Sequence, residues 1–194
     1  QLPTGSGQRA KPQNLWYKNA PKELGWNEEL PNDAIFHFLL PDPGMVSYND
    51  KVIKEMYPAA LEHCKKWNKE FTGEVFTESQ IAHLQRLSKL VDNLWKEWAK
   101  EQTDLRNRTT DPLPVWGDPN NEKDGKWIPL KLKDRIQNQE VEGLNVANTN
   151  ARIRLKWAMD YWVALWFWPI SEAETLPSRD NWLLQLSMIL GDLE

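Results

Sequence analysis

The chain has 194 residues, 12 of them Trp, and a formal net charge of −4 at pH 7. This length is enough to bury a hydrophobic core, and it most simply fits one domain or a domain with an extended arm, with two compact domains as the alternative. The acidic balance excludes an overall positive field that would attract the whole chain to nucleic acid, so any DNA contact has to be local. Cys64 is the only cysteine, which excludes an internal disulfide framework.

The N-terminal residues lack the charged-then-apolar pattern of a secretory signal, so we expect a cytoplasmic protein. We expect no membrane partner, because the apolar aromatic run Tyr161–Ile170 is too short for a spanning helix, which needs about 20 residues. We expect this run to be buried in a core or in an interface. The sequence does not begin with Met, and we expect it to be a piece of a longer polypeptide.

Residues 1–45 are predicted to form an extended arm, because Gly, Pro, Asn and Lys dominate its first part. Within this arm the apolar segment Ala34–Leu40 is bounded by turn residues and predicts one short strand, either isolated or at a sheet edge. The strand is followed by Asp42-Pro43-Gly44, where Pro and then Gly favour a type II turn.

Residues 46–194 are predicted to form a helical domain. A helix begins after Asn49 or Asp50 as N-cap and restarts at Pro58, and a second helix runs from the capping box Thr77–Gln80 to about Arg108. Both carry apolar stripes at helical spacing: Tyr57, Ala60, Leu61, Cys64, Trp67 and Phe71, then Leu84, Leu87, Val91, Leu94, Trp98 and Leu105. We expect an antiparallel hairpin over residues 50–110 that turns at Gly73. An ordinary two-helix packing unit and a protruding coiled-coil spacer both fit this pattern.

A loop is expected over residues 111–130 and further helices over residues 131–194. One helix lies within Lys131–Gln139, and a longer one runs from about Asn148 to Trp168, where Pro169 stops it. Ser178 is predicted to cap a last helix that Gly191 closes. The predicted fold class is therefore mainly α, with a helical hairpin, further helices, one short strand and an extended N-terminal arm.

No segment carries a complete catalytic or cofactor motif. The three histidines, His37, His63 and His83, are isolated and lack the spacing of metal ligands. The chain has neither a Gly-x-Ser-x-Gly elbow nor a Gly-x-x-x-x-Gly-Lys loop. We therefore predict no catalytic, cofactor-binding or metal-binding residue.

Two basic clusters are candidates for DNA binding, because Lys and Arg beside aromatic residues can bind phosphates while the rings stack on bases. A solvated helix face would explain the same charges. The first cluster lies beside Trp16 and Tyr17 and comprises Arg9, Lys11, Lys18 and Lys22. The second comprises Arg152, Arg154 and Lys156, with Arg106 and Arg108 as companions.

Several segments together resemble a known family. They are Ile35–Met45, Asp111–Gly117, and Ala164–Ile170 followed by Leu176–Arg179. In this order they resemble an internal region of the large single-chain adenine-N6 DNA methyltransferases of restriction-modification and phage-defence systems, including the DISARM type. The resemblance covers most of the chain.

The resemblance implies a parent enzyme that binds S-adenosylmethionine in a Rossmann-like domain and methylates adenine after flipping it out of the duplex. That family uses a Gly-rich turn for the cofactor and an Asn-Pro-Pro-aromatic tetrapeptide for the adenine. Neither occurs here: Asp42-Pro43-Gly44 and Asp118-Pro119-Asn120-Asn121 depart from the tetrapeptide. We expect no cofactor in this segment.

Two hypotheses follow for the function of the chain. The first is an accessory or inserted module of such a methyltransferase, which positions double-stranded DNA or braces the catalytic domain. Its partners would be the remainder of the enzyme and DNA. The alternative is a Trp-rich interaction scaffold that docks a partner subunit without contacting DNA. Whether the chain has enzymatic activity of its own is left open by the sequence.

Overall fold

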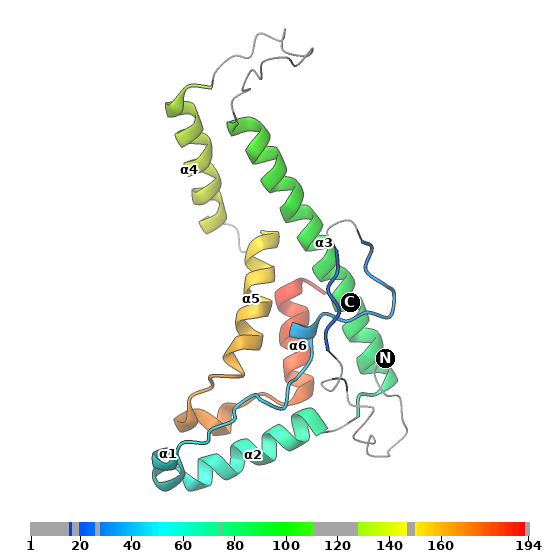
Figure 1. Ribbon diagram of the computed structural model, residues 1–194, viewed down its shortest axis with the longest axis vertical. Helices are drawn as coiled ribbons and strands as arrows, with labels where there is room; N and C mark the ends of the chain where they lie inside the picture. The colour runs from blue at the N-terminus through cyan, green and yellow to red at the C-terminus, as the bar shows by residue number, and fades with distance from the viewer. Residues whose placement is uncertain are drawn as a thin grey trace. The chain divides into compact units, whose positions relative to one another are not determined.

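The computed structural model describes residues 16, 20–25, 28–73, 75–110, 128–146 and 150–192, without the side chains of 140–146. This part of the chain is mainly helical, as predicted (Figure 1). Its elements are η3 (His37–Leu39), α1 (Lys51–Met56), α2 (Pro58–Gly73), α3 (Glu78–Thr109), α4 (Leu130–Val146), α5 (Ala151–Ala164), η4 (Ile170–Thr175) and α6 (Arg179–Leu190). None of the described helices is long and apolar enough to cross a membrane.

The strand predicted over Ala34–Leu40 is wrong. This segment instead contains the 3-10 helix η3, flanked by extended backbone at Phe36 and Leu40. The amides of Leu39 and Leu40 donate to carbonyls three residues earlier, and the Phe36 amide donates to the Ser88 hydroxyl at 3.3 Å. Local bonds and a side chain thus satisfy amides that a strand would have paired across a sheet, while Leu39 is buried.

A turn follows at Asp42-Pro43-Gly44, but it is not the predicted type II turn. The Met45 amide donates to the Asp42 carbonyl at 3.0 Å, while Gly44 does not adopt the positive φ that a type II turn requires. The Asp42 carboxylate also accepts the Gly44 amide at 2.7 Å. Glycine is needed at position 44 for packing and not for a positive φ, because the ring of Trp166 occupies the space that a side chain would fill.

Three predicted helix starts are confirmed. The Asp50 carboxylate accepts the amides of Val52 and Ile53 at the start of α1, and α2 begins at Pro58. At α3 the Thr77 hydroxyl accepts the Gln80 amide at 3.2 Å, and the Gln80 side chain accepts the Thr77 amide at 3.1 Å. This reciprocal pair is the predicted capping box.

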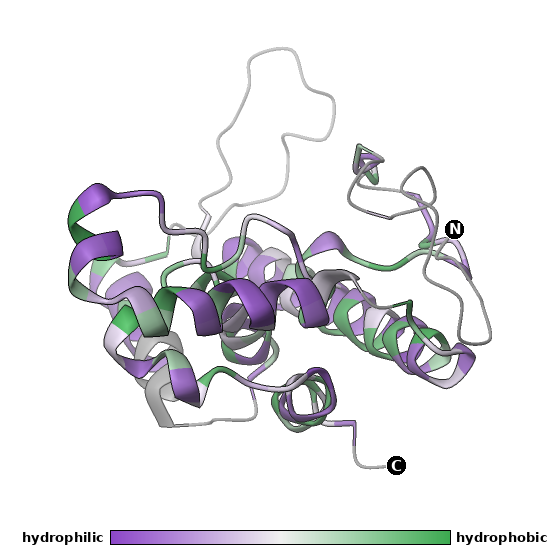
Figure 2. Cartoon of the chain, turned by 90° about the horizontal axis from the view of Figure 1, so that it is seen from below, coloured by the Kyte–Doolittle hydropathy of each residue, from purple (hydrophilic) through white to green (hydrophobic). Residues whose placement is uncertain are grey.

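The apolar stripes of these helices form much of a core, but the predicted hairpin is not confirmed. Among the predicted stripe residues, Leu61, Cys64, Trp67, Phe71, Leu84, Leu87, Val91 and Leu94 are buried. In Figure 1, α2 and α3 run in clearly different directions, and α2 packs mainly against η4, with further contacts to α1 and α6. Figure 2 shows hydrophilic and hydrophobic residues on different sides of the helices, as expected for elements that bury one face.

The helix predicted to reach Trp168 ends earlier, at Ala164. Pro169 has no amide hydrogen to donate to the carbonyl of Leu165, four residues earlier, and its ring would clash with that carbonyl in a continuous helix. The Leu165 carbonyl accepts the Val46 amide at 3.1 Å instead. The aromatic run is consequently split: Leu165 is fully buried, whereas Phe167 is 78% exposed.

The last predicted helix is confirmed as α6. The Ser178 hydroxyl accepts the Asn181 amide at 3.3 Å, and Gly191 ends the helix in the left-handed conformation with φ of 78°. Trp182, Leu183, Leu186 and Leu190 of this helix are buried, as its spacing predicts.

The chain divides into two compact units: residues 1–93 with 155–194, and residues 94–154. In the first unit, stacked rings of Trp67 and Phe71 lie 4.3 Å apart, and Trp182 meets Phe71 edge-on at 5.5 Å. The indole of Trp67 donates to the Pro177 carbonyl at 2.7 Å. The second unit contains the C-terminal part of α3, helix α4 and the start of α5.

Candidate nucleic-acid interface

A cleft of about 440 Å³ lies in the second unit between the C-terminal turns of α3 and the first turns of α4. Arg106 of α3 and Lys133 of α4 both line it, so two cations from separate helices share one surface. The remaining lining residues are mostly polar: Gln102, Leu105, Thr109, Leu130, Asp134 and Gln137. A cleft of this composition suits a polar, negatively charged ligand more than an apolar one.

The same end of the helix pair carries an excess of positive charge. Residues 102–110 and 128–135 contain the cations Arg106, Arg108, Lys131, Lys133 and Arg135 and the two carboxylates Asp104 and Asp134, a formal charge of +3 from five minus two. All these side chains are exposed except that of Lys133, which is half-buried. The chain as a whole is acidic, so this is a local reversal of charge.

The two arginines also have a structural role at the end of α3. Both lie in its last turn, where cations interact favourably with the negative end of the helix dipole. Helix stabilisation alone would account for Arg106 and Arg108. It does not account for Lys131, Lys133 and Arg135, because these cations lie in the first turns of α4, at a positive helix end that favours anions.

The start of α5 lies at the opposite end of α4 from the C-terminal end of α3 (Figure 1). Arg152 is exposed and Arg154 half-buried, both in the first turn of α5. The Asn150 side chain caps this turn by accepting the Arg152 amide at 2.8 Å. The two arginines therefore form a second pair of cations in the same unit, separate from the cleft.

The other candidates from the sequence have different surroundings. Lys156 is exposed and forms an ion pair with Asp160 one turn later on α5, which partly neutralises it. Lys22 is exposed in the first unit and lines a groove described below. Arg9, Lys11 and Lys18 lie outside the described residues.

Sequence reasoning missed Lys131, Lys133 and Arg135 as members of a basic site. Their alternation in the sequence is a visible signal, but it predicts only part of a helix. Their proximity to Arg106 depends on how α4 packs against α3, across a segment whose length and composition do not specify that packing.

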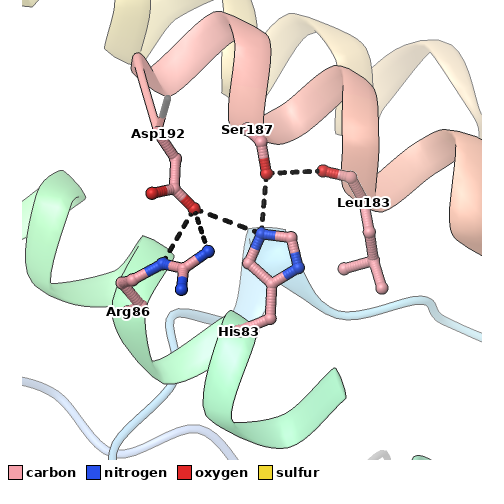
Figure 3. Close-up of polar contacts among 5 residues, drawn as sticks. All are labelled: His83, Arg86, Leu183, Ser187 and Asp192. Atoms are coloured by element: carbon pink, nitrogen blue, oxygen red, sulfur yellow. Dashed lines mark hydrogen bonds and ion pairs between the residues drawn. The ribbon is translucent and has the colours of Figure 1, made fainter. Parts of the chain in front are cut away.

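A polar cluster in the first unit has the residue types of a catalytic triad but not its geometry (Figure 3). The Nε2 atom of His83 lies 2.7 Å from the Ser187 hydroxyl and 3.3 Å from the Asp192 carboxylate. A catalytic triad needs serine and carboxylate on different ring nitrogens, whereas both contact the same nitrogen here. The Ser187 hydroxyl also donates to the Leu183 carbonyl at 3.0 Å, so it is engaged within α6.

This cluster is a junction between α3 and the end of α6. Arg86 of α3 donates to one oxygen of Asp192 through two nitrogens, at 2.7 and 2.9 Å. Asp192 follows the cap residue Gly191, and its amide donates to the Ser187 carbonyl at 2.8 Å. Within the described residues no three His, Cys, Asp or Glu side chains are grouped so that they could hold a metal ion.

Comparison of the chain with known protein families, curated proteins and solved structures finds no match.

Proposed function

We propose that this chain is an accessory helical module of a DNA adenine-N6 methyltransferase and that its α3–α4 pair positions double-stranded DNA by contacting phosphates. The observation that supports the DNA contact is the shared cleft of Arg106 and Lys133, with Arg108, Lys131 and Arg135 at the same end of the pair. The methyltransferase part of the proposal rests on the resemblance of the segments from Ile35–Met45 to Leu176–Arg179. Methyl transfer itself belongs to the remainder of the enzyme, because this chain lacks the family's cofactor and adenine motifs.

The placement of the charges supports a role of the α3–α4 pair in positioning DNA more than a role in recognising its base sequence. Phosphate contacts fix the register of a protein on the duplex, whereas base readout needs an element that enters a groove. The cations come from two helix ends and not from one helix face, which suits contact with a backbone. Such contacts release counterions, so the affinity should fall steeply with salt.

The test is fluorescence anisotropy with a labelled duplex at salt concentrations from about 50 to 200 mM. The variant Arg106→Gln/Lys133→Gln removes both cations of the cleft. Each lost phosphate contact should lower the slope of log affinity against log salt by about 0.9, so we expect a loss of about 1.8. The matched control is Lys65→Gln/Lys66→Gln, which removes two exposed lysines of α2.

The proposal predicts weaker binding and a flatter slope for the cleft variant and an unchanged slope for the control. Equal slopes for the wild type and both variants would refute it. Equal losses in both variants would show that only the total charge matters, which would also remove the special role of the cleft.

One observation favours the alternative function, a scaffold that binds protein. Leu184 and Met188 lie one turn apart on α6 and are 59% and 70% exposed. The Tyr161 hydroxyl of α5 donates to Gln185 between them, and Trp157, one turn from Tyr161, is 42% exposed. If this is a docking face, the chain should self-associate or bind a co-purified subunit, and Leu184→Ser/Met188→Ser should abolish that association in light scattering.

A further inference from the structure

The first unit contains an aromatic groove of about 510 Å³, lined by Trp16, Phe36, His37 and Trp162 among other residues. This volume lies within the range of roughly 300 to 1,000 Å³ that is typical of small-ligand sites. His37 is exposed, and its ring meets that of Trp162 edge-on at 5.8 Å. The groove thus offers aromatic surface at a position that solvent can reach.

The two indoles of the groove are fixed by hydrogen bonds to the backbone beneath them. The Trp162 indole donates to the Leu40 carbonyl at 2.9 Å, and the Trp16 indole donates to the Pro41 carbonyl at 2.8 Å. Because both N–H donors already have acceptors in the protein, neither residue can offer its donor to a ligand. The ring of Trp162 is half-buried and can still contact a ligand, whereas Trp16 is buried and forms the inner wall of the groove. A ligand that pairs with this surface should therefore interact with aromatic faces or edges.

The charges around the groove are mainly negative. Glu23, Glu28 and Asp42 line it together with Lys22, which gives a formal charge of −2 from three carboxylates and one ammonium with His37 neutral. Glu23 is exposed. Glu28 and Asp42 each use one oxygen within the protein, to accept the amides of Gly25 and Gly44, and each carboxylate has a second oxygen that can accept from a ligand.

We propose that the aromatic groove binds an arginine side chain of a partner peptide. A guanidinium is planar and permanently charged, so it can stack on aromatic rings while its N–H groups donate to carboxylates. The groove supplies both kinds of surface in one place. An ammonium would gain the charge attraction but not the planar stacking, and a nucleic-acid segment would place its phosphates against the carboxylates.

The charge at the groove is opposite in sign to the charge at the α3–α4 cleft. This proposal is independent of the proposed DNA contact, because it rests on different residues in a different unit. Loss of DNA binding in the cleft variant would leave the peptide result unaffected.

The probe is a short glycine–serine peptide with one central arginine, acetylated and amidated at its ends, titrated into the whole chain. Binding is followed by NMR through the indole N–H of Trp162, whose resonance is assigned by its loss in Trp162→Phe. Peptides with citrulline or lysine in place of arginine are titrated in parallel. Citrulline keeps the planar shape without the charge, and lysine keeps the charge without the planar group.

We expect the arginine peptide to shift the Trp162 indole resonance, the lysine peptide to bind more weakly and the citrulline peptide not to bind. Glu23→Gln and Asp42→Asn should each weaken binding by up to about fivefold, the upper range for an exposed ion pair. Asp42→Asn keeps a side-chain oxygen that can accept the Gly44 amide, so the turn is preserved. The control Glu29→Gln removes an exposed carboxylate that does not line the groove, and it should bind like the wild type.

Three results would overturn the proposal. The first is no shift of Trp162 at any peptide concentration. The second is a failure of either comparison. The arginine peptide would bind no more tightly than the lysine or citrulline peptide, or the Glu29→Gln control would bind the arginine peptide no more tightly than the two groove variants. The third is a shift of the Trp162 resonance by a single-stranded oligonucleotide that the arginine peptide cannot compete away, which would assign the groove to nucleic acid.

Discussion

The ring of Trp166 lies against the backbone of Gly44. A β-carbon added at Gly44 would be 2.5 Å from Cζ3 and 2.8 Å from Cη2 of that ring. The two residues are far apart in the sequence, and this contact lies next to the hydrogen bond between Val46 and Leu165. The turn after η3 and the turn after α5 are thus packed against each other, and only glycine leaves room for the indole.

Gly44→Ala should lower the free energy of unfolding by about 1 to 3 kcal/mol, because the rigid indole has to move to accommodate a methyl group. The measurement is urea denaturation followed by Trp fluorescence. Gly73→Ala at the end of α2 is the control, since nothing lies within 4 Å of a β-carbon there. It should leave stability unchanged or raise it by up to about 1 kcal/mol. Equal stability of the two variants would show that Trp166 adapts without cost.

A buried arginine should contribute more to stability than any exposed one. Arg179 is 9% exposed, and its guanidinium donates to the carbonyls of Phe71 and Glu70 at 2.5 and 3.4 Å. These carbonyls belong to the last turn of α2, which has no helical amides left to pair with them. The guanidinium carbon also lies 4.4 Å from the centre of the Phe76 ring. One side chain therefore binds the end of α2 and an aromatic ring together.

We predict that Arg179→Met lowers the free energy of unfolding by about 2 to 3 kcal/mol, the range for buried hydrogen bonds to a charged group. Arg179→Lys should lose part of that amount, because an ammonium keeps the charge but not the planar fork. Lys65→Met on the exposed face of α2 is the control and should change stability by less than about 0.5 kcal/mol. Chemical denaturation of the three variants under one set of conditions tests this order, in which Arg179→Met loses the most stability, Arg179→Lys loses less and Lys65→Met loses the least.

The contrast between these residues explains which parts of the fold are visible in the sequence. Asp50, Thr77 with Gln80, and Ser178 act on amides no more than three residues away, so their patterns predict helix starts. Arg179 acts on a carbonyl 108 residues away, and no local pattern indicates that partner. The strand predicted before Pro41 failed for the same reason, because periodicity reports burial but not what the backbone pairs with.

The cations of the second unit show the same difference between local patterns and long-range contacts. The sequence identified Arg106, Arg108, Arg152 and Arg154 as cations near aromatic or helical segments. It could not place Lys133 beside Arg106, because this requires the packing of α3 against α4. The ion pair of Lys156 with Asp160, by contrast, is local, and their four-residue spacing on a helix indicates it.

The stability of the first unit should fall at high pH through Tyr161. Burial raises the pKa of Tyr161 from 10.0 to about 12, and its hydroxyl donates to Gln185. Below pH 10 both the folded and the unfolded chain hold this proton, so its contribution is fully present there. Between pH 10 and 12 only the unfolded state ionises, so the free energy of unfolding falls as the pH rises through the folded-state pKa.

Tyr161→Phe should remove this part of the pH dependence, as measured by urea denaturation at a series of alkaline pH values. Burial also raises the pKa of Tyr48, with the charge of Cys64 as a second cause, so the variant should retain a smaller fall. Tyr48→Phe, made in parallel, should remove the part of that remainder that is due to Tyr48. Burial also raises the pKa of the Cys64 thiol, so a fall due to Cys64 should persist in both variants. An identical alkaline profile for the wild type and Tyr161→Phe would contradict the role of the Tyr161 hydroxyl.

The distance between the two pairs of cations in the second unit predicts how long a duplex must be to contact both pairs. Helix α4 has 17 residues, and at a rise of 1.5 Å per residue it is about 25 Å long. Along B-DNA this corresponds to about seven base pairs at 3.4 Å each. A duplex that lies along α4 can therefore reach Arg106 and Lys133 at one end and Arg152 and Arg154 at the other, whereas a much shorter duplex can reach only one end.

We predict that Arg152→Gln/Arg154→Gln weakens binding to a duplex of about 15 base pairs but has a much smaller effect on a hairpin with a stem of about five. The cleft variant Arg106→Gln/Lys133→Gln should show the same dependence on length. On the long duplex the two double variants should each lower the salt slope, by amounts that add in the combined variant, because the two ends contact different phosphates. If Arg152 and Arg154 are only solvated residues on the surface of α5, their replacement will change neither slope, at either length, and the DNA path along α4 will be wrong even if the cleft binds phosphate.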